Sequence, residues 1–337
     1  MALAGPAQRP GVLVLRALAL GDLLVAVPAL KALRAALPEP LVLAAPRALA
    51  PVAALTGAVD HVVDVRGLDD PLPVELAGAP VAVNLHGRGP QSHALLAAAG
   101  PGRLVAFACP PDHPDGPAWV EHEHERERWC RLVRAGLGPA HPGPDPDDVA
   151  LAVPSVAPPV AGAAVLHVGA GYGSRRWPVE RWAAVASALA ADHRVVLTGS
   201  AAERPDALAV AAAAGLPDDA VLAGRTSLDE LAALVAAAEL VVSGDTGVAH
   251  LASAYAVASV VLFGPAPPAR WSPPPRPQHA VLWHGDPADP WAQGDVYGAA
   301  LDPLLARVLP GEVLAAVERV LDAPRAPLRA RAGRGAP

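Results

Sequence analysis

The segment Leu240–Pro265, LVVSGDTGVAHLASAYAVASVVLFGP, constrains the fold more than any other part of the chain. It begins with a short apolar run, Leu240–Val242, which ends at small and polar residues. From Val248 onward the apolar residues have helical spacing, and a second apolar run follows at Ser259–Phe263. This order predicts a strand, a tight turn, a helix and a second strand.

The turn before this predicted helix has the composition of an anion-binding site. Thr246 can cap the helix, and Gly247 allows a ligand to approach the backbone closely. The free N–H groups of a first helical turn attract negative charge. We therefore expect a phosphate-bearing ligand at this turn.

The composition excludes several classes of protein. The 337 residues suffice for two domains, and a net charge of −7 argues against a nucleic-acid partner, which requires clustered lysine and arginine. Cys109 and Cys130 belong to no CxxC motif or Cys/His set, so we expect neither a disulfide framework nor a metal site. No uninterrupted run of about 18 apolar residues occurs, so we expect a cytoplasmic protein without a transmembrane helix.

Strand and helix signals alternate through the first half of the chain. The first strand, Val12–Leu15, precedes a helix from Asp22 through Ala36, which Pro28 should kink. Further strands are expected at Leu41–Leu43, His61–Val63 and Val81–Leu85, and helices at Arg47–Leu55 and Gln91–Ala98. Such alternation predicts a parallel sheet that is covered on both faces.

A charged helix, Glu121–Gly136, and a proline-rich linker, Gly138–Gly162, separate this half from a second one. There we expect strands at Val165–Val168 and Arg194–Thr198, and helices at Pro178–Ala190, Glu203–Ala214 and Leu228–Ala238. The prediction is an α/β protein with a first domain at residues 1–150 and a second at 151–310. A ligand cleft should lie between the carboxyl ends of the two sheets.

The end of the chain gives weaker signals. We expect irregular structure from Pro265 to Pro310, a last helix within residues 311–322, and a disordered tail over 323–337. The tail is basic, so weak attraction to the inner face of the plasma membrane competes with the interpretation of a simply solvated tail. Its arginines are Arg325, Arg329, Arg331 and Arg334.

Asp22 is the first candidate for chemistry. It follows Arg16 and Gly21 in the loop after the first strand, at the mouth of the predicted sheet. A carboxylate there can act as general base on a hydroxyl in the cleft. The alternative is that Asp22 only caps its helix.

A glycine-rich loop, GAGYGSRRWP from Gly169 to Pro178, follows the first strand of the second half. Ser174 breaks the GxGxxG fingerprint, which disfavours a dehydrogenase, but Arg175 and Arg176 suit a diphosphate. A flexible loop with solvated arginines is the alternative. Glu203 stands where an acidic residue can hold a ribose hydroxyl, or where it merely complements a first helical turn.

Four segments together resemble glycosyltransferase family 9, the ADP-heptose heptosyltransferases. In chain order they are RALALGDLLVAVPALKALR, SRRWPVERW, TGSAAE and GDTGVAHLASAYAVASVVLFGP, which spread over roughly Val12 to Trp271. The resemblance implies a GT-B fold, with two Rossmann-like domains facing across a cleft. It also implies an acceptor site in the first domain, a nucleotide-sugar site in the second, and a last helix that packs back on the first domain.

The resemblance implies roles for individual residues. Asp22 matches the catalytic base, and Arg175 stands beside the diphosphate where the family usually has lysine. Glu203 matches an acidic residue near the nucleoside, while the GDTGxxH motif holds diphosphate and sugar. The full donor-binding set that we expect is Gly21, Gly169, Gly171, Arg175, Glu203, Asp245, Thr246, Gly247 and His250.

The implied reaction is a single inverting displacement that needs no metal or other cofactor. The chain departs from relatives that act on phosphorylated lipopolysaccharide cores, because Leu41–Gly100 holds only Arg47, Arg66 and Arg88. A less anionic glycan or small-molecule acceptor is therefore expected. The acceptor-binding candidates are Arg16, His86, Arg88, Gln91 and Ser92. For those after the strand Val81–Leu85, the alternative is a plain loop between a strand and a helix.

Two other functions remain open at this stage. A catalytically silent relative would bind a nucleotide sugar without transferring it, and a sugar-nucleotide epimerase would share the two-domain architecture. Asp22 favours the enzyme, because a silent relative has no need of the base.

Overall fold

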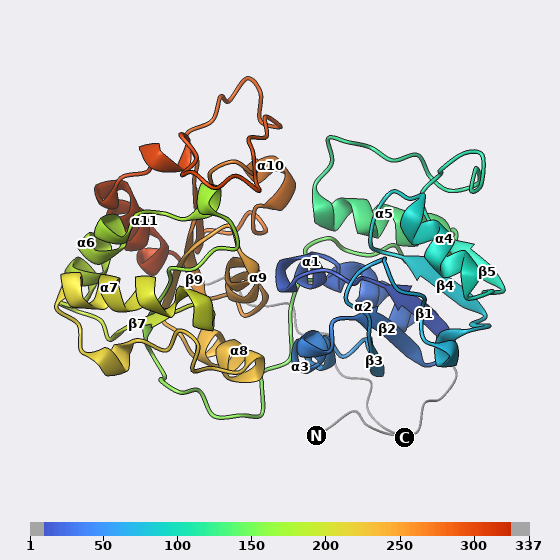
Figure 1. Ribbon diagram of the computed structural model, residues 1–337, viewed down its shortest axis with the longest axis horizontal. Helices are drawn as coiled ribbons and strands as arrows, with labels where there is room; N and C mark the ends of the chain where they lie inside the picture. Colours follow the sequence, from blue (N-terminus) through green and yellow to red (C-terminus); the bar gives the residue numbers. More distant parts are fainter. Residues whose placement is uncertain (1–9, 325–337) are drawn as a thin grey trace.

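The computed structural model describes residues 10–324, which form two domains, each built on a five-stranded parallel sheet (Figure 1). The first sheet has the order β3-β2-β1-β4-β5 and the second the order β10-β9-β8-β6-β7. The first comprises β1 Val12–Leu15, β2 Leu41–Ala45, β3 His61–Asp64, β4 Val81–Asn84 and β5 Arg103–Val105. The second comprises β6 Ala164–His167, β7 Val195–Thr198, β8 Leu240–Gly244, β9 Ala258–Leu262 and β10 His279–Leu282.

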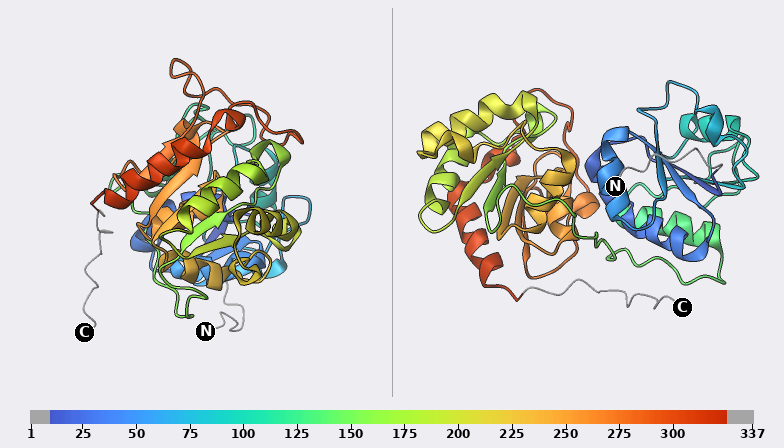
Figure 2. Two further views of the ribbon diagram at one scale, coloured as in Figure 1. Left: turned by 90° about the vertical axis from the view of Figure 1, so that its left-hand side faces the viewer. Right: turned by 90° about the horizontal axis from the view of Figure 1, so that it is seen from below.

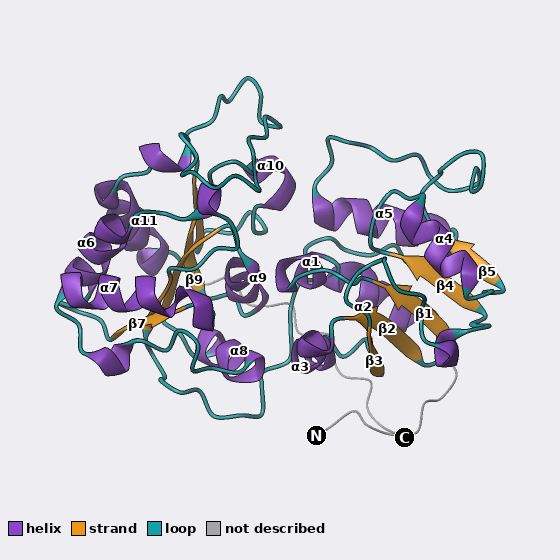
Figure 3. Cartoon of the chain, in the orientation of Figure 1, coloured by secondary structure: helices purple, strands orange, loops and turns teal. Residues whose placement is uncertain are grey.

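Helices cover both faces of each sheet (Figure 3). In the first domain they are α1 Leu20–Val25, α2 Val27–Ala36, α3 Ala50–Leu55, α4 Gln91–Ala98 and α5 Glu125–Leu137. In the second they are α6 Val179–Leu189, α7 Arg204–Ala214, α8 Leu228–Ala236, α9 Gly247–Ala254, α10 Pro268–Trp271 and α11 Pro310–Asp322. Short 3-10 turns include η1 Arg47–Leu49, η2 Val74–Leu76, η3 Gly173–Arg175, η4 Ala201–Glu203, η5 Asp218–Ala220 and η6 Leu305–Arg307.

The continuous apolar runs of the strands explain this double covering. In β1, Val12 and Val14 pack into one core and Leu13 and Leu15 into another, because alternate side chains of a strand point to opposite faces. A strand that is apolar at every position is therefore buried on both sides. The predicted α/β class with two Rossmann-like domains is confirmed, and the two sheets fall on either side of the predicted boundary at residue 150.

The strand orders place the cleft. In the first sheet the chain runs outward from β1 to both sides, so β1 and β4 are neighbours. In the second sheet β6 likewise lies between β7 and β8. A crevice opens at the carboxyl ends of the strands where the order reverses, and ligands of such folds bind there. The loops after β1, β6 and β8 reach this crevice and line it.

The first predicted helix is broken where proline was expected to kink it. The structure has α1 up to Val25 and α2 from Val27, and Pro28 is the second residue of α2. Proline is tolerated in a first helical turn because it lacks only an N–H that would be unpaired there. The charged helix α5 begins at Glu125 rather than at Glu121, since His124 accepts a hydrogen bond from the Arg126 N–H and caps it.

The two domains meet where α1 and α9 lie side by side (Figure 1). A Cβ atom on Gly247 would lie 2.8 to 2.9 Å from side-chain atoms of Leu20, and one on Gly21 would lie 3.3 Å from the His250 ring. Glycine at these two positions therefore allows the helices to approach closely. Apolar side chains of both domains consequently join one continuous core, which includes Leu23 of α1 and Leu251 of α9.

Polar contacts form a second link between the domains. The Ser272 carbonyl accepts a hydrogen bond from Arg126 Nη1 at 2.7 Å and lies 3.1 Å from His124 Nε2. Arg270 Nη2 donates to the Glu121 carbonyl at 3.1 Å. The segment between α5 and β6 passes from one domain to the other along the outside of the sheets (Figure 2).

Three features differ from the sequence-based expectations. Strand β10 lies within a segment predicted to be irregular, and β5 is an additional short edge strand. The last helix does not pack back on the first domain, so that prediction is wrong. Instead α11 contacts β9, β10 and α6 and buries Val313, Ala316 and Val317 in the core of the second domain.

The predicted C-terminal tail is described only in part. Ala323 and Pro324 are described, whereas residues 325–337 of the predicted disordered, membrane-attracted tail lie outside the described residues. No helix between residues 10 and 324 is long and apolar enough to cross a bilayer.

The α1–α9 contact yields a testable prediction. We expect Gly247→Ala to destabilise the protein by about 1–3 kcal/mol, because the added methyl group overpacks the interface against Leu20. Urea unfolding would measure the loss. Gly67→Ala is the matched control, since a Cβ atom there meets nothing within 4 Å. Equal unfolding midpoints for the two variants would contradict a tight domain contact.

Candidate functional site

A cleft with a volume of about 500 Å³ lies between the domains, within the size range of small-molecule sites. The first domain contributes Ala19, Gly21 and Asp22 to its lining. The second domain contributes Gly171, Tyr172, Arg175, Asp245, Thr246, Gly247, His250, Ala266, Arg270, Trp271, Gln293, Val296 and Tyr297. The structure therefore brings together eight of the predicted residues: Gly21, Asp22, Gly171, Arg175, Asp245, Thr246, Gly247 and His250.

Asp22 lies in the first turn of α1 with its side chain 27% exposed toward the cleft. Its Oδ2 accepts a hydrogen bond from the Ala19 N–H at 3.3 Å, and its Oδ1 lies 3.5 Å from Arg16 Nη2. Asp22 thus bonds the start of its helix and also lines the cleft. The two alternatives considered for this residue are compatible with each other.

Arg16 is buried behind Asp22 rather than exposed to an acceptor. Its side chain is 1% exposed, its guanidinium lies 4.6 Å from the Trp129 ring centroid, and Nη1 donates to the Leu85 carbonyl. Nε donates to the Asp22 carbonyl at 2.8 Å. Burial lowers the pKa of Arg16, and the nearby charge of Asp22 opposes this effect. The geometry suits Arg16 to orient Asp22.

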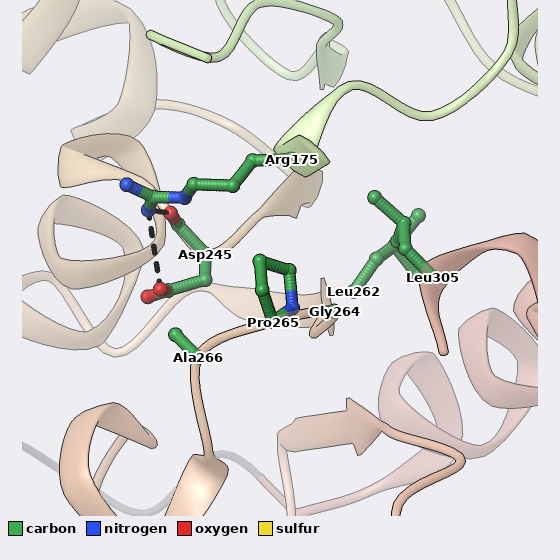
Figure 4. Close-up of a pocket in the computed structure, with 7 residues that line it drawn as sticks. All are labelled: Arg175, Asp245, Leu262, Gly264, Pro265, Ala266 and Leu305. Carbon is green, nitrogen blue, oxygen red and sulfur yellow. Dashed lines mark hydrogen bonds and ion pairs between the residues drawn. The ribbon is translucent and has the colours of Figure 1, made fainter. Parts of the chain in front are cut away.

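On the opposite wall, Arg175 pairs with Asp245 (Figure 4). Arg175 ends the 3-10 turn η3, and Asp245 follows β8. Arg175 Nη2 donates to the Asp245 carbonyl and, at 3.1 Å, to Oδ2 of the same residue. Burial raises the pKa of Asp245 to about 6, an effect that the Arg175 charge opposes and the Asp22 charge increases. Both carboxylates line the cleft, Asp22 from the first domain and Asp245 from the second.

Thr246 does not cap α9 as expected. Its hydroxyl is buried without a hydrogen-bond partner among the described residues, and no side-chain cap bonds the first turn of the helix. Its backbone is extended, as in a capping residue, but the hydroxyl is not bonded to the first turn. The N–H groups at the start of α9 and this hydroxyl are therefore both available to an anion.

His250 lies one turn into α9 and is buried at the α1 contact. Burial lowers its pKa to about 3, with further lowering from the charges of Arg126, His124 and Arg175. The ring is consequently neutral across the physiological range. A neutral imidazole can donate one hydrogen bond to a ligand and accept another.

Gly169 and Glu203 lie next to each other behind the cleft. A Cβ atom on Gly169 would fall 2.1 Å from Glu203 Oε2, so only glycine leaves room for this carboxylate. Glu203 is mostly buried, and Oε2 accepts a hydrogen bond from the Ser200 N–H at 2.7 Å. Neither residue lines the cleft, and their roles in nucleotide binding stay predictions.

The remaining acceptor candidates do not line the cleft either. Ser92 is buried and accepts a hydrogen bond from Asn84 Nδ2 at 2.8 Å, so it holds the loop after β4 together. Arg88 in this loop and Gln91, the first residue of α4, are exposed. His86 follows β4, and the charges of Arg16 and Asp22 act on its ring. Burial, the main cause, and the Arg16 charge lower the pKa of His86 to about 4.

Sequence reasoning missed half of the lining. Tyr172 lies within the glycine-rich loop that was singled out for its arginines, and Arg270 and Trp271 follow the FGP motif closely. Ala19, Ala266, Gln293, Val296 and Tyr297 complete the set. The last three belong to a segment without periodicity, which gives no signal of where it folds. No group of three or more His, Cys, Asp and Glu side chains suited to a metal ion occurs in the described residues.

Residues 123–292 match the family model of glycosyltransferase family 9 (heptosyltransferase). The match covers 170 of the 337 residues, which is half of the chain. The chain belongs to glycosyltransferase family 9. It is therefore a glycosyltransferase, and its two Rossmann-like domains form the GT-B fold. No curated protein matches the chain.

Solved structures of family members share the fold. ADP-heptose LPS heptosyltransferase II of E. coli has 20% identity and a TM-score of 0.70, covering 92% of this chain and 98% of that one. A family 9 glycosyltransferase from Veillonella parvula has 18% identity and a TM-score of 0.72, covering 95% and 99%. E. coli heptosyltransferase WaaC with ADP has 19% identity and a TM-score of 0.66, covering 91% and 98%.

The raised pKa of Asp245 predicts a pH-dependent stability. Its folded pKa of about 6 exceeds the ordinary aspartate pKa of 3.8, so between these values the folded protein binds more protons than the unfolded chain. Stability from this group therefore falls as pH rises. We expect Asp245→Asn, which is always neutral, to gain about 2 kcal/mol relative to the wild type between pH 4 and pH 8.

Urea unfolding of both proteins at the two pH values would measure this change. If the unfolding free energy of Asp245→Asn minus that of the wild type stays constant with pH, or falls as pH rises, the buried, proton-binding state of Asp245 is contradicted.

Proposed function

We propose that the protein is an inverting glycosyltransferase that moves a heptose from ADP-heptose to a hydroxyl of a glycan or another acceptor, with Asp22 as general base. The observation that supports this reaction is the placement of Asp22 on one wall of the cleft and of Arg175 and Asp245–Gly247 on the other. ADP-heptose is favoured because the E. coli heptosyltransferase WaaC has been solved with ADP and with ADP-2-deoxy-2-fluoro heptose.

The displacement occurs in one step. Asp22 accepts the proton of the acceptor hydroxyl while that oxygen forms a bond to the anomeric carbon. The bond from this carbon to the diphosphate oxygen breaks on the opposite face, its electron pair leaves with ADP, and the anomeric configuration inverts. Arg16 and the Ala19 N–H each hold one oxygen of Asp22, which fixes the direction of its remaining lone pairs.

The second domain stabilises the departing diphosphate. Arg175 supplies a positive charge, the first turn of α9 supplies backbone N–H groups, and neutral His250 can supply one more hydrogen bond. These groups provide positive potential where negative charge develops, so we propose a metal-independent step. The negative diphosphate further favours the protonated form of Asp245, whose pKa is already raised to about 6.

A catalytically silent relative fits the site less well. Such a protein would need only the wall formed by the second domain, yet Asp22 is held at the cleft by two separate hydrogen-bonding groups. An epimerase would need no acceptor hydroxyl opposite the diphosphate. Weak binding of the basic tail to an anionic membrane surface stays a proposal, since most of the tail lies outside the described residues.

Replacing the base gives the first functional prediction. Asp22→Asn should slow ADP release from ADP-heptose, in the presence of a mixture of glycosides, by about 10²–10⁴-fold, because general-base catalysis contributes this much. The dissociation constant of ADP should change by less than about threefold, because Asp22 and the diphosphate wall belong to different domains. Calorimetry would measure the affinity and chromatography the release. A variant that loses ADP binding but still transfers sugar would reverse these roles.

The donor gives a second prediction. Calorimetric titration with ADP, GDP, UDP and NAD, with and without Mg²⁺, should show ADP binding at least about tenfold tighter than the others, since a wrong base leaves polar groups unpaired. The affinity should not depend on Mg²⁺. Preference for UDP or GDP would replace ADP as the donor nucleotide, and failure to bind any of them would contradict the proposed transferase site.

A further inference from the structure

Two tyrosines stand out among the side chains of the cleft. In residues 10–324, Tyr172 and Tyr297 are the only Phe, Tyr or Trp side chains that are exposed, at 45% and 71%. Both line the cleft. Exposed aromatic surface is costly to hydrate, and its concentration at one site indicates that a ligand covers it.

The pair is held in place by the backbone. The two rings lie edge to face, with centroids 5.0 Å apart and planes at 82°. The Ser174 N–H donates to the Gly298 carbonyl at 2.9 Å, which joins the loop of Tyr172 to the segment of Tyr297. A Cβ atom on Gly173 would lie 1.9 Å from the Ala299 carbonyl oxygen, so the two segments are in direct contact. Backbone contacts between the two segments therefore hold the tyrosines together at the cleft.

The charges of the cleft indicate what kind of ligand fits. Its lining has two arginines, and both are already paired: Arg175 with Asp245, and Arg270 with Glu121 at 3.2 Å. The first domain contributes one charged group to the lining, the carboxylate of Asp22. Once a diphosphate binds Arg175, no unpaired cation is left in the described lining for a second anionic substrate.

We propose that Tyr172 and Tyr297 form a subsite for a sugar ring of an uncharged glycan acceptor. The apolar C–H face of a sugar ring packs on an aromatic ring, and the tyrosine hydroxyls can bond to the hydroxyl groups at its edge. Gln293, from the same segment as Tyr297, adds an amide for the same purpose. The inference rests on the proposed transferase function and specifies the chemical class of its acceptor.

The position of the two tyrosines favours the acceptor, rather than the donor nucleoside, as the ligand that they bind. The donor diphosphate is assigned to Arg175 and the start of α9, where the helices of the two domains close the cleft. Tyr297 is the more exposed of the two rings, which places it at the open rim. Asp22 and both tyrosines line the same cleft, so a glycan whose reacting hydroxyl reaches Asp22 can extend along the lining to these exposed rings.

The test is a binding experiment on full-length protein saturated with ADP. Neutral methyl glycosides and disaccharides, and the 6-phosphates of the same sugars, are titrated and followed by saturation-transfer NMR. We expect neutral sugars to bind more tightly than their phosphates. Tyr297→Ala should weaken their binding about tenfold, whereas Tyr297→Phe, which keeps the ring, should stay within about threefold of the wild type.

Val74→Ala is the matched control, because Val74 is exposed but lies outside the cleft lining. Thermal unfolding confirms that each variant is folded. The proposal is overturned if no neutral sugar binds, if the phosphates bind more tightly, or if Tyr297→Ala leaves sugar affinity unchanged. It is also overturned if Tyr297→Ala lowers the affinity for ADP instead of the affinity for sugars, since the tyrosines would then hold the nucleoside. Failure of wild-type protein to bind ADP would separately contradict the proposed function.

Discussion

The close approach of α1 and α9 is the contact on which the site depends. Asp22 belongs to one domain and the anion-binding turn at Thr246 and Gly247 to the other, so neither wall makes a site by itself. Glycine at positions 21 and 247 removes the side-chain atoms that would hold the helices apart. The same contact joins apolar residues of both domains into one core, and burial of that surface holds the two walls at a working distance. A site shared between domains thus acquires its geometry from packing rather than from a rigid loop.

Paired charges give the cleft its chemistry. Arg16 faces Asp22, Arg175 faces Asp245, and Arg270 faces Glu121. A buried charge is costly without a partner, so pairing offsets this cost for Arg16 and Asp245, whose side chains are 1% and 10% exposed. Glu121 is 57% exposed, so its pair with Arg270 contributes less. In the proposed donor complex a diphosphate competes with Asp245 for Arg175, and the raised pKa of Asp245 makes this carboxylate the one that readily becomes neutral. Asp22, the proposed base, instead keeps the buried Arg16 behind it, which holds its orientation.

The sequence predicted what depends on local pattern. Most strands and helices were placed correctly, because apolar runs and helical spacing are short-range signals, and Pro28 marked a true break. Strands β5 and β10 were missed because they are short and partly exposed. The position of α11 depends on which apolar surface its face meets, which spacing alone does not tell. Arg16 and Thr246 show the same limit at the site. Tertiary structure decides that Arg16 bonds the Leu85 carbonyl, and that the Thr246 hydroxyl is buried without a partner among the described residues.

More of the predicted donor residues than of the predicted acceptor residues line the cleft, and the structure gives a physical reason. The donor residues occupy turns directly after buried strands, where little variation is compatible with the sheet and with a diphosphate. The proposed acceptor side is formed by loops that the sheet does not constrain. Of the arginines in Leu41–Gly100, Arg66 pairs with Asp64 and Arg88 is not part of the cleft lining. Tyr297 reaches the cleft from a loop after β10 that makes no contribution to either sheet. Such loops can change the acceptor without disturbing the base, the diphosphate site or the domain contact.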